Sequence, residues 1–299
     1  MSLLRIGSRG SQLALKQVAI VEQYLKGINH PYCVQFIKTS GDMIQDRPLY
    51  DIGGKALFSK EIERALLSKA VDLGVHSLKD LETPRPVGLM LCAFLPRADA
   101  RDVLVTEVDL EAKTIRGCPV QDLSKGAVVG TSSPRRMAQL HHQRADLELI
   151  NIRGNVETRL QKVGKACDAV ILAKAGLDRL GYQVEDTACV PLHDMVPSGG
   201  QGIIALECRS DDTVTQALLK GMNDTRAEQA AMIERGIIEG LNASCRSAVG
   251  IHAIVNDSDI AVSVFMENQG ITTLTQVFAA STPQESIILE VLKKLPKFS

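Results

Sequence analysis

Short apolar segments, polar turns and amphipathic stretches follow one another in the same order along most of this chain. The strand-like residues 3–6, apolar except for Arg5, lead into a glycine- and serine-rich turn at 7–11, after which small and branched apolar residues recur at helical spacing up to residue 26. The same succession returns between residues 127 and 179. Strands that alternate with helices predict an α/β fold with parallel sheets that bind ligands at the carboxyl ends of their strands.

Two polar segments interrupt this order and predict domain boundaries. The first runs from Pro96 to Arg101, and the second, from Val196 to Gly202, contains three glycines. From about residue 217 the chain reads as a helix, three strands and a last helix, which is α+β in character. We therefore expect a discontinuous first domain (1–95 with 197–216), a second domain (96–196) and a smaller third domain (217–299). Residues 38–58 show no clear period, and a loop of that length is usually functional.

Composition excludes several classes of function. The net charge of -1 gives no overall attraction to nucleic acid or to an anionic membrane, and aromatic residues make up only 3% of the chain. The seven cysteines form no CxxC pair, so neither a disulfide framework nor a metal site is indicated. We find no signal-peptide pattern and no run near the roughly 20 apolar residues that span a bilayer. We expect a cytoplasmic protein.

Five arginines stand at or near predicted strand ends and helix starts: Arg9, Arg135, Arg136, Arg153 and Arg159. Taken singly, such an arginine is more often a solvated surface charge. If the strands are parallel and adjacent, however, the guanidiniums converge on one rim, where their planar forks bind carboxylate or phosphate. The set therefore favours an anion site.

Two further positions carry reactive side chains. Lys79 and Asp80 follow the predicted strand Leu73–His76, where a carboxylate beside a lysine can stay ionised and stabilise a cation. A capping Asp80 with a surface Lys79 is the plain alternative, and His76 reads as a satisfied strand residue rather than a base. Cys245 lies in a small polar loop with Arg246 beside it. Composition alone favours an unreactive thiol there.

In these residues the sequence resembles the porphobilinogen deaminase, or hydroxymethylbilane synthase, family. The match follows the chain in order and covers nearly its whole length, more loosely in the third region. The matching residues are Arg9, Ser11 and Gln17, Gly53 to Phe58, Val75 to Asp80, Gly130 to Arg136, Arg153 to Val156, Ala175 to Gly181, Gly200 to Gly202, and Cys245. The chain departs from the family pattern at Glu82, at Ser198-Gly199 and at Ala243-Ser244.

The resemblance implies a transferase of tetrapyrrole and haem biosynthesis. Such an enzyme joins four porphobilinogen molecules head to tail with loss of ammonia, and water releases the linear tetrapyrrole. The implied fold has two type II periplasmic-binding-protein-like domains around a cleft and a third domain that carries Cys245. A dipyrromethane cofactor is implied at that cysteine through a thioether. The implied protein is a monomer, and the resemblance leaves room for a transient contact with the next enzyme of the pathway.

The resemblance also implies residue roles. Asp80 and Lys79 would be catalytic and would contact the cofactor together with Ser133, Arg135, Arg136, Arg153, Asn155 and Arg159. The substrate would be bound by Arg9, Ser11, Gln17, Ser77, Arg179 and Gln201, with Phe58 closing over it.

Two rival functions fit an arginine-lined α/β cleft. One is a non-catalytic small-anion-binding protein of the periplasmic-binding-protein fold, for which an export signal would be expected. The other is an anion-responsive regulatory module, but the sequence contains no helix-turn-helix with a basic face.

Overall fold

The computed structural model describes residues 2–39, 59–244 and 246–297. By internal contacts the chain forms two compact units, each built from two pieces of sequence. Unit 1 consists of Met1–Arg97 with Ile203–Met232, and unit 2 of Ala98–Gly202 with Ile233–Ser299. The chain thus passes from one unit to the other three times. The division into three domains stays a prediction.

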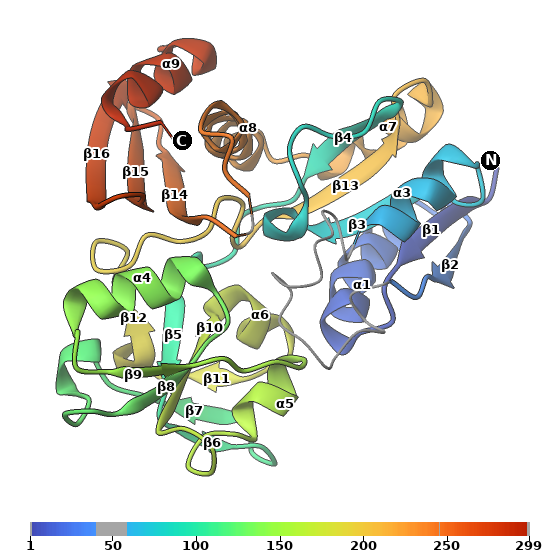
Figure 1. The fold of residues 1–299 in the computed structure, drawn as a ribbon. Coiled ribbons are helices and arrows are strands. Elements are labelled where there is room, and N and C mark those ends of the chain that lie inside the picture. The colour runs from blue at the N-terminus through green and yellow to red at the C-terminus, as the bar shows by residue number, and fades with distance from the viewer. Residues whose placement is uncertain (1, 40–58, 245, 298–299) are drawn as a thin grey trace. The chain divides into compact units, whose positions relative to one another are not determined.

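Unit 1 is a five-stranded sheet with helices on both faces (Figure 1). Its strand order is β2-β1-β3-β13-β4. The elements are β1 (Leu4–Ser8), α1 (Gln12–Gly27), β2 (Tyr32–Phe36), α3 (Lys60–Leu67), β3 (Leu73–Ser77), the 3-10 turn η1 (Leu78–Asp80), β4 (Leu89–Phe94), β13 (Ile204–Arg209), α7 (Thr213–Leu219), the 3-10 turn η4 (Lys220–Met222) and the first half of α8 (Thr225–Gly240).

Alternation along β13 explains how the two faces of this sheet are covered. Ile204 and Leu206 point into a core built with α1 and with Leu219 at the end of α7. Ala205, one position out of phase, packs with Ala227 and other residues on the opposite face, where α8 begins. The core is aliphatic, as the low aromatic content predicts.

Unit 2 contains a second five-stranded sheet, of order β12-β5-β10-β8-β9, and a small sheet, β11-β7-β6. Its elements up to residue 202 are β5 (Asp102–Val105), β6 (Glu107–Asp109), β7 (Thr114–Arg116), η2 (Val120–Asp122), β8 (Val128–Gly130), α4 (Pro134–Gln143), β9 (Glu148–Ile150), α5 (Val156–Leu160), β10 (Ala169–Ala173), α6 (Lys174–Arg179), β11 (Gln183–Val184), η3 (Asp186–Ala188) and β12 (Cys189–Val190). Leu140 of α4 packs on one face of the larger sheet.

The expectation of parallel sheets is wrong in one respect. Strands β2, β1 and β3 run parallel, as do β9, β8 and β10, but β13 and β5 each run antiparallel to both of their neighbours. A helical crossover brings the next strand in parallel. Strands β5 and β13 instead enter their sheets directly from a passage between the units, so this constraint does not apply to them.

The C-terminal part of unit 2 is a three-stranded antiparallel sheet covered by two helices. It comprises β14 (Ala248–Val255), β15 (Asp259–Glu267), β16 (Ile271–Ala279), α9 (Gln284–Lys294) and the second half of α8. Gly236 and Gly240 lie one helical turn apart on α8, and a Cβ there would stand 2.4 Å from Ile288 and 2.3 Å from Leu292. Glycine at both positions therefore lets α9 approach α8 closely.

We predict that Leu206→Ala lowers the free energy of unfolding by about 2–5 kcal/mol, because it leaves a cavity at a fully buried position in the core between β13 and α1. Denaturant titration would measure this. Val214→Ala, at a side chain 70% exposed on α7, is the control and should change stability little. Equal effects of the two substitutions would contradict this assignment of the core.

Candidate functional site

A pocket in unit 1 lies where β1 and β3 end and where α1 and α3 begin. Five of the residues predicted to bind substrate or act on it line this pocket: Arg9, Ser11, Gln17, Ser77 and Asp80. Ser59 and His76 also line it. The structure thus brings together side chains that stand far apart in the sequence, as expected for the carboxyl ends of parallel strands.

Local contacts explain how this pocket is held. Ser11 caps α1 by accepting a hydrogen bond from the Ala14 amide at 3.3 Å. Gln17, further along the same helix and only 3% exposed, donates from Nε2 to Ser77 Oγ at 2.6 Å. This bond ties α1 to the end of β3. Both Gln17 and Ser77 are thereby fixed with polar atoms at the pocket.

The Asp80 carboxylate is exposed at the pocket and makes no hydrogen bond or ion pair with another described residue. Asp80 ends η1, whose Leu78 is buried and anchors the turn. A carboxylate that is held at a pocket without a protein partner is available to a ligand. Lys79 is half-buried and is not among the residues that line the pocket.

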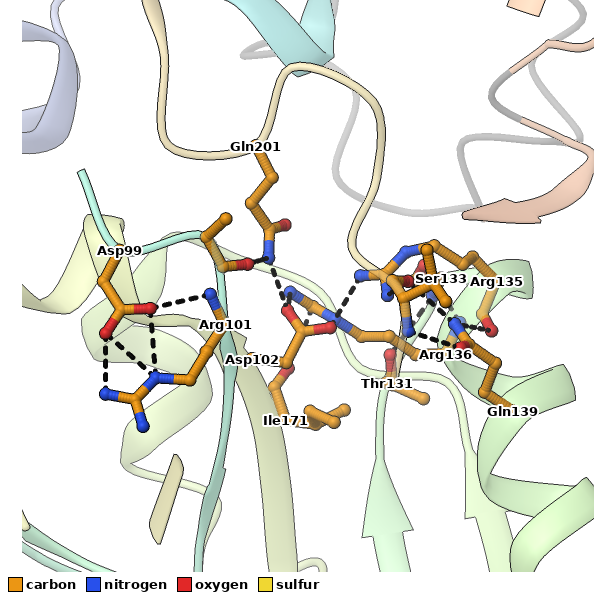
Figure 2. A network of polar contacts seen from close by, with 12 residues as sticks. Asp99, Arg101, Asp102, Thr131, Ser133, Arg135, Arg136, Gln139, Ile171 and Gln201 are labelled. Carbon is orange, nitrogen blue, oxygen red and sulfur yellow. Dashed lines mark hydrogen bonds and ion pairs between the residues drawn. The ribbon is translucent and has the colours of Figure 1, made fainter. Parts of the chain in front are cut away.

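A cluster of buried polar groups lies in unit 2 at the start of β5 (Figure 2). Asp102 is fully buried there, and it accepts hydrogen bonds from Arg135 Nη2, Arg136 Nη2 and Gln201 Nε2, each at 2.8 Å. Arg135 also donates to the Val196 carbonyl and Arg136 to the Ile171 carbonyl. Asp102 thus joins α4, β5 and the segment around Gln201.

The charges in this Asp102 cluster do not balance. Two guanidiniums, 4% and 6% exposed, face a single carboxylate. Among the described residues, neither Arg135 Nε nor Arg136 Nε has a hydrogen-bond acceptor. Buried N–H donors are normally paired, so these two atoms are exceptions to that rule.

The electrostatics of the cluster follow from burial and charge. Burial opposes ionisation of Asp102, but the two arginines and the Gln201 amide outweigh it and hold the pKa of Asp102 well below its usual range. Burial, together with repulsion from Arg136, lowers the pKa of Arg135 against the attraction of Asp102. Asp102 is therefore ionised throughout the neutral range.

Comparison with known proteins identifies the relatives of this chain. The family model described as "Porphobilinogen deaminase, dipyromethane cofactor binding domain" matches residues 4–217, a span that includes both the pocket and the Asp102 cluster. The chain belongs to the porphobilinogen deaminase family. The resemblance seen in the sequence is thereby confirmed.

Curated porphobilinogen deaminases match over most of their length. The protein of Nitrobacter hamburgensis is 44% identical over 263 residues, which cover 86% of this chain and 81% of that protein. The protein of Syntrophobacter fumaroxidans is 40% identical, with 95% and 90% covered, and that of Rickettsia bellii is 42% identical, with 95% and 94% covered.

Solved structures show a more distant likeness. The periplasmic VFT2 domain of BvgS from Bordetella pertussis has a TM-score of 0.41 at 14% identity, with 73% of this chain and 85% of that chain covered. A periplasmic substrate-binding protein of an ABC transporter from Coxiella burnetii has a TM-score of 0.43 at 12% identity, with 73% and 91% covered. These scores are too low to bear on function. The two mixed sheets with helices confirm the predicted α/β class directly.

Three of the predicted arginines make local contacts that define their positions. Arg135 and Arg136 lie at a capped helix start, as predicted: they occupy the first turn of α4 after its cap Ser133 and are directed at Asp102. Arg159 lies within α5, and its Nε donates to the Gly154 carbonyl at 2.8 Å. The sequence pattern did not reveal Asp102, an ordinary strand residue, as the partner of Arg135 and Arg136.

The other predicted residues of unit 2 are placed as follows. Asn155 caps α5 by accepting from the Thr158 amide, and Arg153 just before it is half-buried. Arg179 ends α6 and donates to the Gly202 carbonyl at 2.7 Å, and its burial lowers its pKa. Gln201 is 1% exposed and also donates to the Ala100 carbonyl. The ligand-binding roles of these residues stay predictions.

Cys245 and Phe58 lie outside the described residues. Arg9 belongs to unit 1 and the four other arginines to unit 2, so their gathering at one rim stays a prediction. In the described part of the chain, no helix is both long and apolar enough to cross a membrane.

We predict that Asp102→Asn lowers the free energy of unfolding at pH 7 by about 3–5 kcal/mol, because it leaves two buried guanidiniums without a counter-charge. The pKa of Asp102 is lower in the folded state than the value of about 3.9 expected for an unfolded chain. Its stabilisation is therefore complete above that value and is lost as the pH falls further. Thermal unfolding of the wild type and the variant should differ more at pH 7 than at pH 3.

The matched control is Asp146→Asn. Asp146 also binds an arginine, the half-buried Arg144, but the Asp146 carboxylate lies at the surface, where water and salt screen the pair. Its effect at pH 7 should be much smaller than that of Asp102→Asn. A wild-type advantage over Asp102→Asn that stays constant between pH 7 and pH 3 would contradict the assignment of an ionised Asp102.

Proposed function

We propose that this protein is a hydroxymethylbilane synthase, a transferase that joins four porphobilinogen molecules with loss of ammonia and releases the linear tetrapyrrole with water. The observation that carries the proposal is the family match over residues 4–217, because it spans the pocket of unit 1 and the Asp102 cluster of unit 2. We further propose a monomer in the cytoplasm that passes its product to the next enzyme of the pathway through, at most, a transient contact.

The pocket of unit 1 suits the incoming substrate. Porphobilinogen carries an acetate, a propionate and an aminomethyl group on a pyrrole ring. Arg9 supplies a guanidinium for a carboxylate, and Ser11, Ser77 and Gln17 supply neutral polar atoms at the pocket wall. We propose that these four residues orient the ring, and that Arg179 and Gln201 contribute to substrate binding and Phe58 to closure.

Asp80 is the catalytic residue of this proposal. Loss of ammonia from the aminomethyl group leaves a cation that is delocalised over the pyrrole ring. A fixed carboxylate stabilises that cation and accepts a hydrogen bond from the pyrrole N–H, which holds the ring in position. The exposed Asp80 carboxylate is suited to both tasks because no residue in the described part of the chain pairs with it.

The residues of unit 2 fit a cofactor rich in carboxylates. The excess positive charge of Arg135 and Arg136 over Asp102 favours an anion bound nearby. We propose that Ser133, Arg153, Asn155 and Arg159, together with Lys79 and Asp80 of unit 1, complete the binding of a dipyrromethane joined by a thioether to Cys245. When bound, the dipyrromethane supplies the fixed end on which the chain of pyrroles grows.

The rival reading, a non-catalytic anion-binding protein, shares the need for a cationic pocket. It is disfavoured because the curated relatives are named as the enzyme and match over more than four fifths of their length. A binding protein also needs no covalent attachment point, which makes the mass of the protein decisive.

Intact-protein mass spectrometry tests the proposed cofactor. After expression with porphobilinogen available, the wild-type mass should exceed that of the bare chain by one dipyrromethane, because Cys245 is alkylated. Cys245→Ser should show the bare mass. A wild type that carries no added mass under these conditions would count against the enzyme and in favour of the binding protein.

Asp80→Ala tests the catalytic role. We expect kcat to fall by on the order of 10²–10³-fold, the usual loss when one electrostatic stabiliser is removed, while thermal stability is unchanged because Asp80 is exposed. Product formation and thermal unfolding would be measured together. Asp211→Ala, at another exposed carboxylate of unit 1, is the control and should keep wild-type turnover. Near-normal kcat for Asp80→Ala would remove Asp80 from the mechanism.

A further inference from the structure

Arg85 is a buried charge that the proposed reaction does not use. It lies between η1 and β4, and its side chain is 10% exposed. Its Nη2 stands 2.6 Å from Glu63 Oε1 on α3 and 2.6 Å from Glu207 Oε1 on β13, and its Nε donates to the same Glu207 oxygen at 2.9 Å. One guanidinium therefore joins a helix and a strand to the segment that follows Asp80.

The two carboxylates that bind Arg85, those of Glu63 and Glu207, each contact a residue that lines the pocket. Glu63 Oε1 accepts a hydrogen bond of 2.6 Å from Ser59 Oγ. Glu207 Oε2 lies 3.2 Å from His76 Nε2, a contact that becomes an ion pair when the imidazole is protonated. Ser59 and His76 both line the pocket. Two walls of the pocket are thus connected to the same guanidinium through one carboxylate each.

Arg85 also fixes the third wall, which carries Asp80. Its Nη1 donates to the Glu82 carbonyl at 3.3 Å, two residues beyond Asp80. The Asp80 carboxylate makes no hydrogen bond or ion pair in the described part of the chain, so its position depends on the backbone on either side. Leu78 and Leu81 anchor that backbone by burial, and Arg85 adds a hydrogen bond to the Glu82 carbonyl just beyond Leu81.

The charges explain why these contacts are strong. The side chains of Glu63 and Glu207 are 8% and 0% exposed, and two buried carboxylates require cations. Burial opposes ionisation of Glu207, but His76 and Arg85 outweigh it and lower the pKa of Glu207. Burial likewise opposes the charge on Arg85, and Glu207 and Glu63 raise the pKa of Arg85 in spite of it. Arg85 and Glu207 are therefore both ionised at neutral pH.

We propose that Arg85 is a positioning residue that sets the geometry of the pocket around Asp80 through Glu63, Glu207 and the Glu82 carbonyl. The proposal rests on the function proposed above for that pocket. Arg85 touches no substrate; it fixes the distance from Asp80 to the walls formed by Ser59 and His76. A catalytic carboxylate displaced by about 1 Å loses on the order of 10²-fold in rate, so this restraint is expected to govern kcat more than KM.

The test separates positioning from stability. Arg85→Leu alone leaves two buried carboxylates without their cation and is expected to lower the melting temperature. The double variant Arg85→Leu/Glu63→Gln removes one negative charge together with the positive one, and the amide oxygen of the introduced glutamine can still accept from Ser59 Oγ. We expect the double variant to regain part of the melting temperature lost in Arg85→Leu, because only Glu207 is then left without the guanidinium, yet to keep a kcat reduced on the order of 10²-fold with a much smaller change in KM.

Hydrogen exchange measured by mass spectrometry gives a readout that does not depend on turnover. In the double variant, exchange should rise in peptides covering 78–88, which lose their tether, and stay unchanged in α9 of unit 2. Arg5→Leu is the matched control, because it removes an arginine–carboxylate pair with Asp72 near the opposite ends of β1 and β3. It should leave kcat and exchange at 78–88 as in the wild type.

The measurements of kcat, melting temperature and hydrogen exchange distinguish failure of the positioning role from failure of the proposed function. A double variant with wild-type kcat, or with unchanged exchange at 78–88, overturns the positioning role. A wild type that does not turn over porphobilinogen refutes the proposed function instead, and the exchange at 78–88 then decides whether Arg85 restrains the Asp80 segment. Restored stability with low kcat and raised exchange supports the proposal.

Discussion

The placement of one buried carboxylate, Asp102, determines the arrangement of much of unit 2. Asp102 binds the buried guanidiniums of Arg135 and Arg136 at the start of β5. Because both arginines belong to the first turn of α4, that helix has to begin within their reach of β5. Asp102 also holds the Gln201 amide beside the passage between the units. Pairing one carboxylate with two guanidiniums leaves a positive charge over, and burial makes that surplus effective at attracting an anion.

Unit 1 contains a buried ion cluster with the opposite imbalance of charge, because carboxylates outnumber guanidiniums there. There a single guanidinium, Arg85, pairs with two buried carboxylates, Glu63 and Glu207, while Asp80 nearby in the sequence remains exposed. The two units thus offer complementary chemistry on similar sheets: an available negative charge at Asp80 in one and a surplus of positive charge at Arg135 and Arg136 in the other.

Much of this arrangement could be predicted from the sequence, and the exceptions have physical reasons. The positions of β1, α1, β3 and β10 followed from periodicity and caps, and the five pocket residues were named together by the family resemblance. The antiparallel entry of β5 and β13 was missed because pairing direction depends on where the chain arrives from. The partners of Arg135 and Arg85 were missed because Asp102, Glu63 and Glu207 are ordinary-looking residues within regular elements, and burial becomes visible only when the elements pack.

The three passages of the chain between the units have a consequence for how the protein can be divided. Neither unit corresponds to one continuous stretch, since β13 and half of α8 complete unit 1 only after most of unit 2 has been traversed. A fragment that stops before residue 203 would therefore lack the second-to-last strand of its first sheet, and during synthesis that sheet must wait for a segment made long after its other strands. Protein engineers who wish to separate the units would need to reconnect the chain rather than cut it.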